Sequence, residues 1–436
     1  MIKQVLSTTV QNINNFFGTL RPLEFSETIL LCLFVAIYPF SWQLSLYVSF
    51  AVLLNAIIRM ISYHSFGNSY SRLTKFAVII FPALYVAYLV SMTYTQNSAE
   101  GWQTMFHKLP MVLFPLYFLC AGLQYITKRQ LRLIGYAFAL SCTAVALINI
   151  FGDLYKVLFA GASGAIFYGA HKFTPHHTYN AMYFLFSIVF LYTDSKRHRG
   201  DYTSWWKIVC CLCMALLMTV TWFVGSRSGV IILICLVLWF LHDITFGSGH
   251  KKLGLGVVGG IVILIVVTLF VSPGAHNRLG ETMRDAIGEK EDIRYKIWSN
   301  AVQVIKENPV LGVGVGDRID ALKDNHTKNH TGYWNNYNPH NQFLDAWMSA
   351  GLLSFFLTLA IFILPAIYAL RKKPVSGMLV AFVFITGVTS LVESVLERQM
   401  GIMFICFACC LLLLPQSSQQ MHRPIGDEAR PASKKQ

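Results

Sequence analysis

The chain has 436 residues, of which 55% are hydrophobic and only 13% are charged. A soluble domain carries about 25% charged residues, so this composition excludes an ordinary soluble enzyme and indicates a membrane protein. The formal net charge of +14 does not indicate a nucleic-acid partner, because most basic residues gather in the short loops of one side of the predicted membrane.

Apolar blocks of about 16–24 residues recur along the chain, which is roughly the length that crosses the hydrocarbon core as a helix. Backbone groups must be satisfied inside the bilayer, so these blocks are expected to be helical. The twelve blocks are 27–42, 44–62, 75–94, 109–126, 130–151, 178–193, 205–223, 228–245, 253–271, 347–370, 375–392 and 399–415. The sequence therefore predicts an all-α polytopic membrane protein with about twelve transmembrane helices and one large, partly helical external loop.

The distribution of Lys and Arg predicts the orientation in the membrane. The short loops and termini of one side hold 21 of these residues, whereas the short loops opposite hold five, and basic residues favour the cytoplasmic side. Both termini are therefore expected to be cytoplasmic. Residues 1–271 would form helices 1–9, 272–346 the external loop, 347–415 helices 10–12, and 416–436 a disordered cytoplasmic tail.

Polar residues whose side chains can bind a substrate or take part in a reaction lie on the predicted external face before the large loop. Lys108 stands at the mouth of the fourth helix, and the adjacent His176 and His177 precede the sixth. Arg227 opens the eighth helix, where its guanidinium can make bidentate contacts with phosphate oxygens. Alternatively, Arg227 is an arginine that extends from a helix end to the membrane surface.

The large loop carries an amphipathic pattern and a short motif. Residues 291–307 show apolar positions at helical spacing and place Arg294 beside Trp298, although a solvated helix face explains Arg294 equally simply. The run from Gly312 to Gly316 lacks the Lys-Ser/Thr of a nucleotide loop and predicts close backbone packing.

Pro339-His340-Asn341 leads directly into the tenth helix. An ordinary imidazole is largely neutral at pH 7, so His340 can accept a proton from a hydroxyl; its simpler interpretation is an interfacial or capping histidine. Together with Arg227 and Arg294, and with Arg398 on the same face, it suits an anionic, lipid-borne substrate beside an acceptor hydroxyl.

No metal or other cofactor is expected. The pair His176–His177 resembles half a metal site, but the external segments contain no D-x-D, and Asp317, Asp320 and Asp324 lack convincing ligand spacing. All ten cysteines fall within predicted helices, so no external disulfide framework is expected. Cys210, Cys211 and Cys213 could suggest a metal site, but no His or Asp joins them, and packing is the simpler role.

These motifs resemble the bacterial O-antigen ligase and O-antigen polymerase superfamily. The resemblance rests on Arg294-x-x-x-Trp298, Asn308-Pro309, the glycines 312, 314 and 316, His340-Asn341-x-Phe343-Leu344, and Ser226-Arg227-Ser228 opening a helix. It covers almost the whole chain. One departure is Ala350, which stands before Gly351 where the family usually has an acidic residue.

The resemblance implies a glycosyltransferase of the bacterial inner membrane that needs no metal and inverts the anomeric centre. Such a ligase moves O-antigen glycan from undecaprenyl diphosphate onto a hydroxyl of lipid A–core at the periplasmic face. It implies that Arg227 and Arg294 hold the diphosphate and that His340 is the base. Lys108, His176, His177, Trp298, Asn341 and Arg398 are expected to bind substrate.

Two alternatives remain open from the sequence. An O-antigen polymerase or protein O-oligosaccharyltransferase of the same superfamily would share the motifs, although polymerases often have a second large external loop and residues 152–177 are modest in length. A transporter of lipid-linked glycan would favour charged residues inside helices and inverted repeats, and neither is evident in the sequence.

Overall fold

The structure is a computed structural model of the chain that describes residues 20–68, 70–123, 126–159, 176–198, 200, 203–223, 226–247, 293–329, 338–372 and 376–414. In these ranges the regular structure is helical, with one isolated bridge between Phe66 and Ala121 and no strand. The helices are α2 (Pro22–Ile37), α3 (Trp42–Tyr63), α4 (Arg72–Ser91), α5 (Ser98–Lys108), α6 (Pro110–Cys120), α7 (Lys128–Phe159), α8 (His177–Arg197), α9 (Ser204–Phe223), α10 (Arg227–His242), the π-helical turn η1 (Asp243–Gly247), α13 (Ile293–Glu307), α14 (Arg318–Lys328), α15 (Gln342–Arg371), α16 (Gly377–Ser390) and α17 (Gln399–Leu413).

Every predicted apolar block overlaps one of these helices except 253–271, which lies outside the described residues together with the tail 416–436. Within the described residues, six helices are long and apolar enough to cross a membrane: α3, α4, α7, α9, α15, and α10 with its extension to Phe246. Helices α16 and α17 are apolar but shorter. The all-helical membrane fold is therefore confirmed, whereas the number of twelve crossings stays a prediction.

The outer surface of α3 has the character expected of a lipid-facing helix. Its large apolar side chains, including Leu44, Leu54 and Ile61, are exposed, whereas Ser45 and Ser49 on the opposite face are buried. Small residues allow helix backbones to approach closely in a membrane, where lipid is as apolar as leucine. In a soluble protein the apolar face of a helix is buried and the polar face is exposed. The reverse arrangement in α3 indicates that lipid covers its exposed surface.

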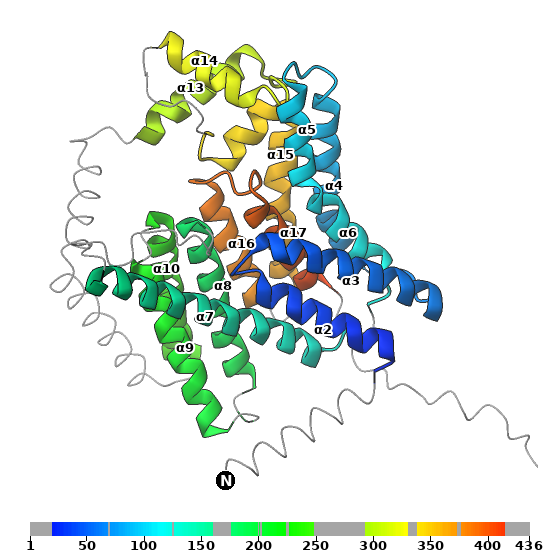
Figure 1. Cartoon of the computed structure of the whole chain (residues 1–436), viewed down its shortest axis with the longest axis vertical. Helices are drawn as coiled ribbons and strands as arrows, with labels where there is room; N and C mark the ends of the chain where they lie inside the picture. Colours follow the sequence, from blue (N-terminus) through cyan, green and yellow to red (C-terminus); the bar gives the residue numbers. More distant parts are fainter. Residues whose placement is uncertain are drawn as a thin grey trace, which may run out of the picture.

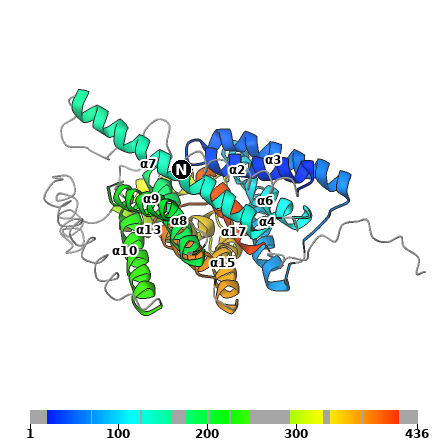
Figure 2. The same cartoon turned by 90° about the horizontal axis from the view of Figure 1, so that it is seen from below.

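Two short helices depart from the predicted loops. Most of residues 95–108, which lie between two predicted crossings, form α5, which continues through Leu109 into α6. Helix α14 was also not predicted, whereas α13 confirms the helix expected at 291–307. Figure 1 shows α13, α14 and α5 gathered at one end of the molecule, where α15 begins its descent along α4; Figure 2 shows the same body from below.

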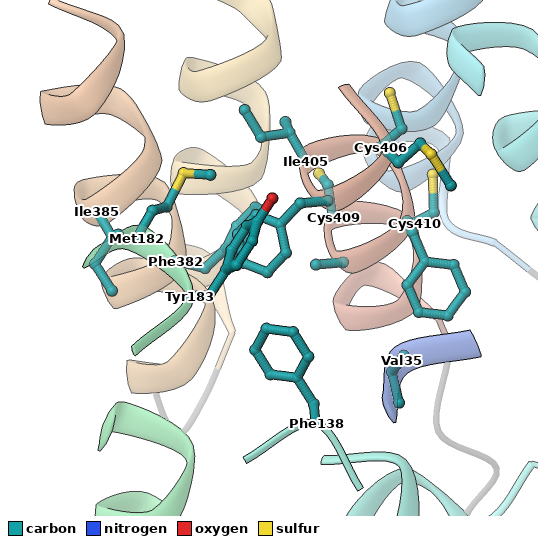
Figure 3. Packing of buried hydrophobic residues seen from close by; sticks show 14 of the residues in the cluster. Val35, Phe138, Met182, Tyr183, Phe382, Ile385, Ile405, Cys406, Cys409 and Cys410 are labelled. Atoms are coloured by element: carbon teal, nitrogen blue, oxygen red, sulfur yellow. The ribbon is translucent and has the colours of Figure 1, made fainter. Parts of the chain in front are cut away.

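The core contains helices that are distant in the sequence. Figure 3 shows Cys406, Cys409 and Cys410 of α17 buried near Tyr183 of α8 and Phe382 of α16. These three cysteines are buried and pack as small apolar side chains. The Tyr183 hydroxyl donates to the Met400 carbonyl at 2.6 Å, which brings the start of α8 and the start of α17 to the same end of the helix body.

Two charged residues of the first helices are buried. Glu27 lies in α2 and Arg59 in α3, both with no exposed side-chain surface. They form an ion pair, to which Tyr117 adds a hydrogen bond from its hydroxyl to Glu27 Oε1 at 2.7 Å. Arg59 also donates to the Gly122 carbonyl at 2.9 Å. Buried charges persist only when paired in this way, and a sequence pattern does not reveal such pairing.

Candidate functional site

His340 lies at a sharp corner of the backbone immediately before α15. Its φ angle is 46°, which places a non-glycine residue in the left-handed region. Asn341 caps α15, because its side-chain oxygen accepts hydrogen bonds from the amides of Phe343 and Leu344 at 3.0 and 3.2 Å. The cap fixes the start of the helix and so fixes His340 at its mouth.

Three consecutive residues of this motif hold the turn that joins α16 to α17. Each makes one hydrogen bond to the segment 391–397, which is more than 45 residues away in the chain. The contacts are His340 Nδ1 with Glu393 Oε2 at 3.2 Å, Asn341 Nδ2 with the Leu391 carbonyl at 3.1 Å, and the Leu396 amide with Gln342 Oε1 at 2.6 Å. The motif and this turn therefore form one unit.

The Glu393 carboxylate is the charge that faces His340. Its side chain is 7% exposed, whereas that of His340 is 26% exposed, so the imidazole reaches solvent and its partner does not. Burial alone would raise the pKa of Glu393, but the hydrogen bond with His340 and the nearby His176 and Arg398 hold that pKa below its usual value. Glu393 is thus ionised near neutral pH and can stabilise a proton on His340.

His176 and Arg398 belong to the same electrostatic neighbourhood. Burial lowers the pKa of His176. The nearby Glu393 raises this pKa, whereas Arg398 and His340 lower it further. Arg398 precedes the first residue of α17 and is exposed. The rings of His176 and His177 lie close together at the start of α8, with centroids 3.7 Å apart and ring planes tilted by 41°. The structure therefore brings four predicted site residues to the neighbouring ends of α8, α15 and α17.

Arg227 lies at the first turn of α10, which begins beside this group. Ser226 caps the helix by accepting a hydrogen bond from the Gly229 amide at 3.2 Å. A Cβ atom at Gly229 would lie 2.8 Å from the Cβ of Ala181 in the first turn of α8, so the starts of the two helices are in close contact. Arg227 itself is exposed, at the end of α10 that packs against the end of α8 carrying His177.

Helix α13 supports the His340 corner from the loop side. The indole nitrogen of Trp298 donates to the Pro339 carbonyl at 2.9 Å, which ties α13 to the motif. Arg294 lies one turn earlier on the same helix, so it projects from the same side, and it is partly buried. The hydrogen bonds that Trp298 and Asn341 make go to the protein's own backbone, which gives these two residues a positioning role in addition to the substrate contact predicted for them.

Lys108 does not join the exposed cations. Its side chain has no exposed surface; it forms an ion pair with Glu397, donates to the Leu396 carbonyl at 2.8 Å and lies 4.5 Å from the centroid of the Tyr88 ring. Arg318 completes the clamp by donating to the other Glu397 oxygen at 2.6 Å. Lys108 was expected to bind substrate from the mouth of the fourth helix, but its ammonium group is paired with the buried Glu397 carboxylate instead.

The glycine-rich run docks the loop onto a break in α15. Residues Ala350 and Gly351 have non-helical backbone angles, and the run satisfies backbone groups at the break. The Val313 amide donates to the Met348 carbonyl at 2.8 Å, and a Cβ at Gly351, whose φ is 72°, would lie 1.9 Å from the Val310 carbonyl oxygen. Only glycine fits there. The predicted role of the run in close backbone packing is confirmed.

The sequence motifs do not indicate five residues that the structure places at or beside the site: Glu393, Glu397, Gln342, Arg318 and Asp345. A signal for the first two was present: Glu393 and Glu397 are two carboxylates four residues apart in the short turn between two apolar helices. Such charges are costly near a membrane unless they have partners. The identity of those partners depends on tertiary contacts, and no spacing in the sequence indicates them.

Within the described part of the chain, no group of three or more His, Cys, Asp or Glu side chains is placed to hold a metal ion. Two acidic residues at the start of α14 have other partners. Asp317 accepts hydrogen bonds from the amides of Gln96 and Asn97, both at 2.7 Å, and Asp320 accepts one from the Asn97 side chain at 2.8 Å. These contacts fasten α14 to the start of α5. A mechanism without metal stays a prediction.

Comparison with known proteins agrees with the motifs. Residues 208–359 match the family model described as O-antigen ligase; this range contains Arg227, Arg294 and His340 but ends before Glu393. A curated protein of Haemophilus influenzae, described as an uncharacterized protein, is 24% identical over 187 residues, which cover 39% of this chain and 45% of that protein. The match thus spans less than half of that relative. Over residues 208–359, the chain is therefore similar to the O-antigen ligase family.

Proposed function

We propose that this protein is an O-antigen ligase, which transfers a glycan from undecaprenyl diphosphate to a hydroxyl of lipid A–core at the periplasmic face of the bacterial inner membrane. The observation that supports it most is the contact of His340 with the buried Glu393 at the mouth of α15. A carboxylate that orients an imidazole is the arrangement that general-base chemistry requires.

In the proposed reaction, His340 accepts the proton of the acceptor hydroxyl. The acceptor oxygen forms a bond to the anomeric carbon of the donor sugar from the face opposite the leaving group. The bond from that carbon to the diphosphate oxygen breaks, and its electron pair leaves with the diphosphate. The anomeric centre is thereby inverted, and Glu393 stabilises the imidazolium that forms on His340.

The leaving diphosphate gains negative charge as its bond breaks. Arg227 and Arg294 are proposed to bind it, with Arg398 as a third cation at the same end of the helix body. Guanidinium groups held in place before reaction stabilise such charge without reorganisation. His176 and His177 are proposed to contact either the phosphates or the acceptor sugar. This arrangement requires neither a metal ion nor another cofactor.

The two carboxylates of the turn do not form a glycosidase pair. Hydrolysis by paired carboxylates needs one acid and one base or nucleophile flanking the sugar. Glu393 faces His340, and the oxygens of Glu397 bind Lys108 and Arg318. Transfer driven by an activated diphosphate donor accounts better for these contacts than hydrolysis does.

The lipopolysaccharide of a strain that lacks the gene tests the proposal. A ligase deletion should lose the long-chain ladder while undecaprenyl-linked polymer accumulates. Lipid A–core carrying a single repeat would instead indicate a polymerase of the same superfamily. An unchanged lipopolysaccharide with altered glycoprotein would indicate a protein O-oligosaccharyltransferase.

A further inference from the structure

Two tiers of ionic contacts connect residues 340–345 with residues 393–397. In the outer tier His340 meets Glu393, and in the inner tier Arg318 joins Asp345 to Glu397. Arg318 Nη2 lies 2.6 Å from Glu397 Oε2, and its Nε lies 3.6 Å from Asp345 Oδ1. The outer tier is partly exposed, whereas every side chain of the inner tier is buried.

Glu397 is the centre of the inner tier. One of its oxygens binds Lys108 at the end of α5, and the other binds Arg318 at the start of α14. Burial alone would raise the pKa of Glu397, but Arg318 and Lys108 lower it to about 2, so the carboxylate is ionised. Helices α5 and α14 therefore both bind, through Lys108 and Arg318, one carboxylate of the turn that joins α16 to α17.

Backbone hydrogen bonds within the turn connect Glu397 to Glu393. The Val395 amide donates to the Glu393 carbonyl at 3.0 Å, and the Glu397 amide donates to the Ser394 carbonyl at 3.1 Å. A Cβ at Gly401 would lie 1.9 Å from the Val395 carbonyl oxygen, so α17 packs directly against the turn. A displacement of Glu397 must therefore move Glu393 as well.

We propose that Glu397 is a positioning residue of the transfer reaction: held by Lys108 and Arg318, it fixes the turn that sets Glu393 against His340. This inference rests on the proposed function for its kinetic part only. A base displaced by about 1 Å can lose about a hundredfold in rate, so an anchor of this kind acts on turnover although it touches neither substrate nor base.

Four substitutions test the proposal in the full-length protein. Glu397→Gln removes the charge at the centre of the inner tier. Glu27→Gln is a matched control, because it removes an equally buried carboxylate that also pairs with an arginine. Glu393→Gln and the double substitution complete a mutant cycle, which measures whether the two glutamates act through one another.

Amide exchange measured by mass spectrometry provides a readout that does not depend on activity. Peptides that cover 391–398 should exchange faster in Glu397→Gln than in wild type, and Glu27→Gln should leave them unchanged. Unchanged exchange of 391–398 in a folded Glu397→Gln protein would overturn the proposal. If this substitution prevents folding, Gln342→Met removes the acceptor of the Leu396 amide without a change of charge and should accelerate exchange in the same peptides.

Transfer kinetics in proteoliposomes, with undecaprenyl-diphosphate-linked O-antigen and lipid A–core, provide the second readout. We expect Glu397→Gln to lower kcat by about a hundredfold and to leave the KM for the donor unchanged, because other residues bind the diphosphate. In the Glu393→Gln background the same substitution should have no further effect. Additive losses would overturn the proposal, whereas absence of transfer by wild type with faster exchange in Glu397→Gln would refute the proposed function and leave the anchor in place.

Discussion

The pairs Glu27–Arg59 and Glu393–His340 each join distant parts of the chain, but they differ in exposure. Neither Glu27 nor Arg59 has exposed side-chain surface, and their further partners are groups of the neighbouring helices and loops. His340 keeps about a quarter of its side chain exposed above a buried carboxylate. A pair enclosed by the protein serves the fold, whereas a pair that is open on one side is available to a substrate. The comparison makes predictions that separate stability from activity.

The largest effect is expected at the open pair. His340→Ala should lower glycan transfer by about 10²–10⁴-fold, which is the usual contribution of a positioned general base, and should leave the melting temperature close to that of wild type. Transfer by purified protein in proteoliposomes measures the first quantity. A wild-type rate in this variant would remove His340 from the chemistry.

The enclosed pair should show the opposite behaviour. Glu27→Gln leaves Arg59 buried beside a neutral side chain, and breaking a buried pair costs about 3–5 kcal/mol of stability. Thermal unfolding in detergent measures this loss, and turnover per folded molecule should not change. If turnover falls while stability is retained, the division between enclosed and open pairs is wrong.

The two arginines proposed to bind the diphosphate are expected to contribute less each. Arg227→Ala or Arg294→Ala should cost about 2–4 kcal/mol of transition-state stabilisation, read as the fall in kcat/KM. Replacement by Lys should restore little activity, because an ammonium group cannot make the bidentate contact. Full activity in both Lys variants would mean that only positive charge matters at these positions.

A smaller effect concerns acid stability. The folded protein holds the pKa of Glu393 below its usual value of about 4.3, so its ionised form stabilises the fold above that pH, and this contribution is lost as the pH falls towards the lower folded pKa. The melting temperature of Glu393→Gln should therefore decline less than that of wild type between about pH 5 and 3. Parallel declines would show that Glu393 gains nothing from His340.

No effect is expected from removal of divalent ions. The proposed site neutralises the diphosphate with guanidinium groups, so transfer in excess EDTA should equal transfer without it. His176 and His177 are the residues that threaten this prediction, because paired imidazoles bind transition metals. Loss of activity on chelation, restored by one particular divalent ion, would reassign the charge neutralisation from the arginines to a metal.

Hydropathy predicted most of the helices because lipid imposes a simple requirement on every crossing segment. It could not predict α5. It also could not predict that Lys108 is buried in an ion pair, since the partner Glu397 lies 289 residues further along the chain. The motif around His340 was found from its chemistry and its place before an apolar helix. Its carboxylate partner was not, because the contact depends on how α15 and the 391–397 turn pack, and that packing leaves no periodic trace in the sequence.

The left-handed backbone of His340 has a consequence for the protein's evolution. Such a conformation costs a residue with a side chain about 1–2 kcal/mol relative to glycine, so backbone strain favours glycine at this position while the contact with Glu393 favours histidine. In a population of variants selected for thermal resistance alone, with no demand for glycan transfer, the residue that comes to occupy position 340 would show which of the two effects is larger. If glycine prevails in that population but histidine persists at position 340 under selection for growth, histidine is retained for a function other than folding.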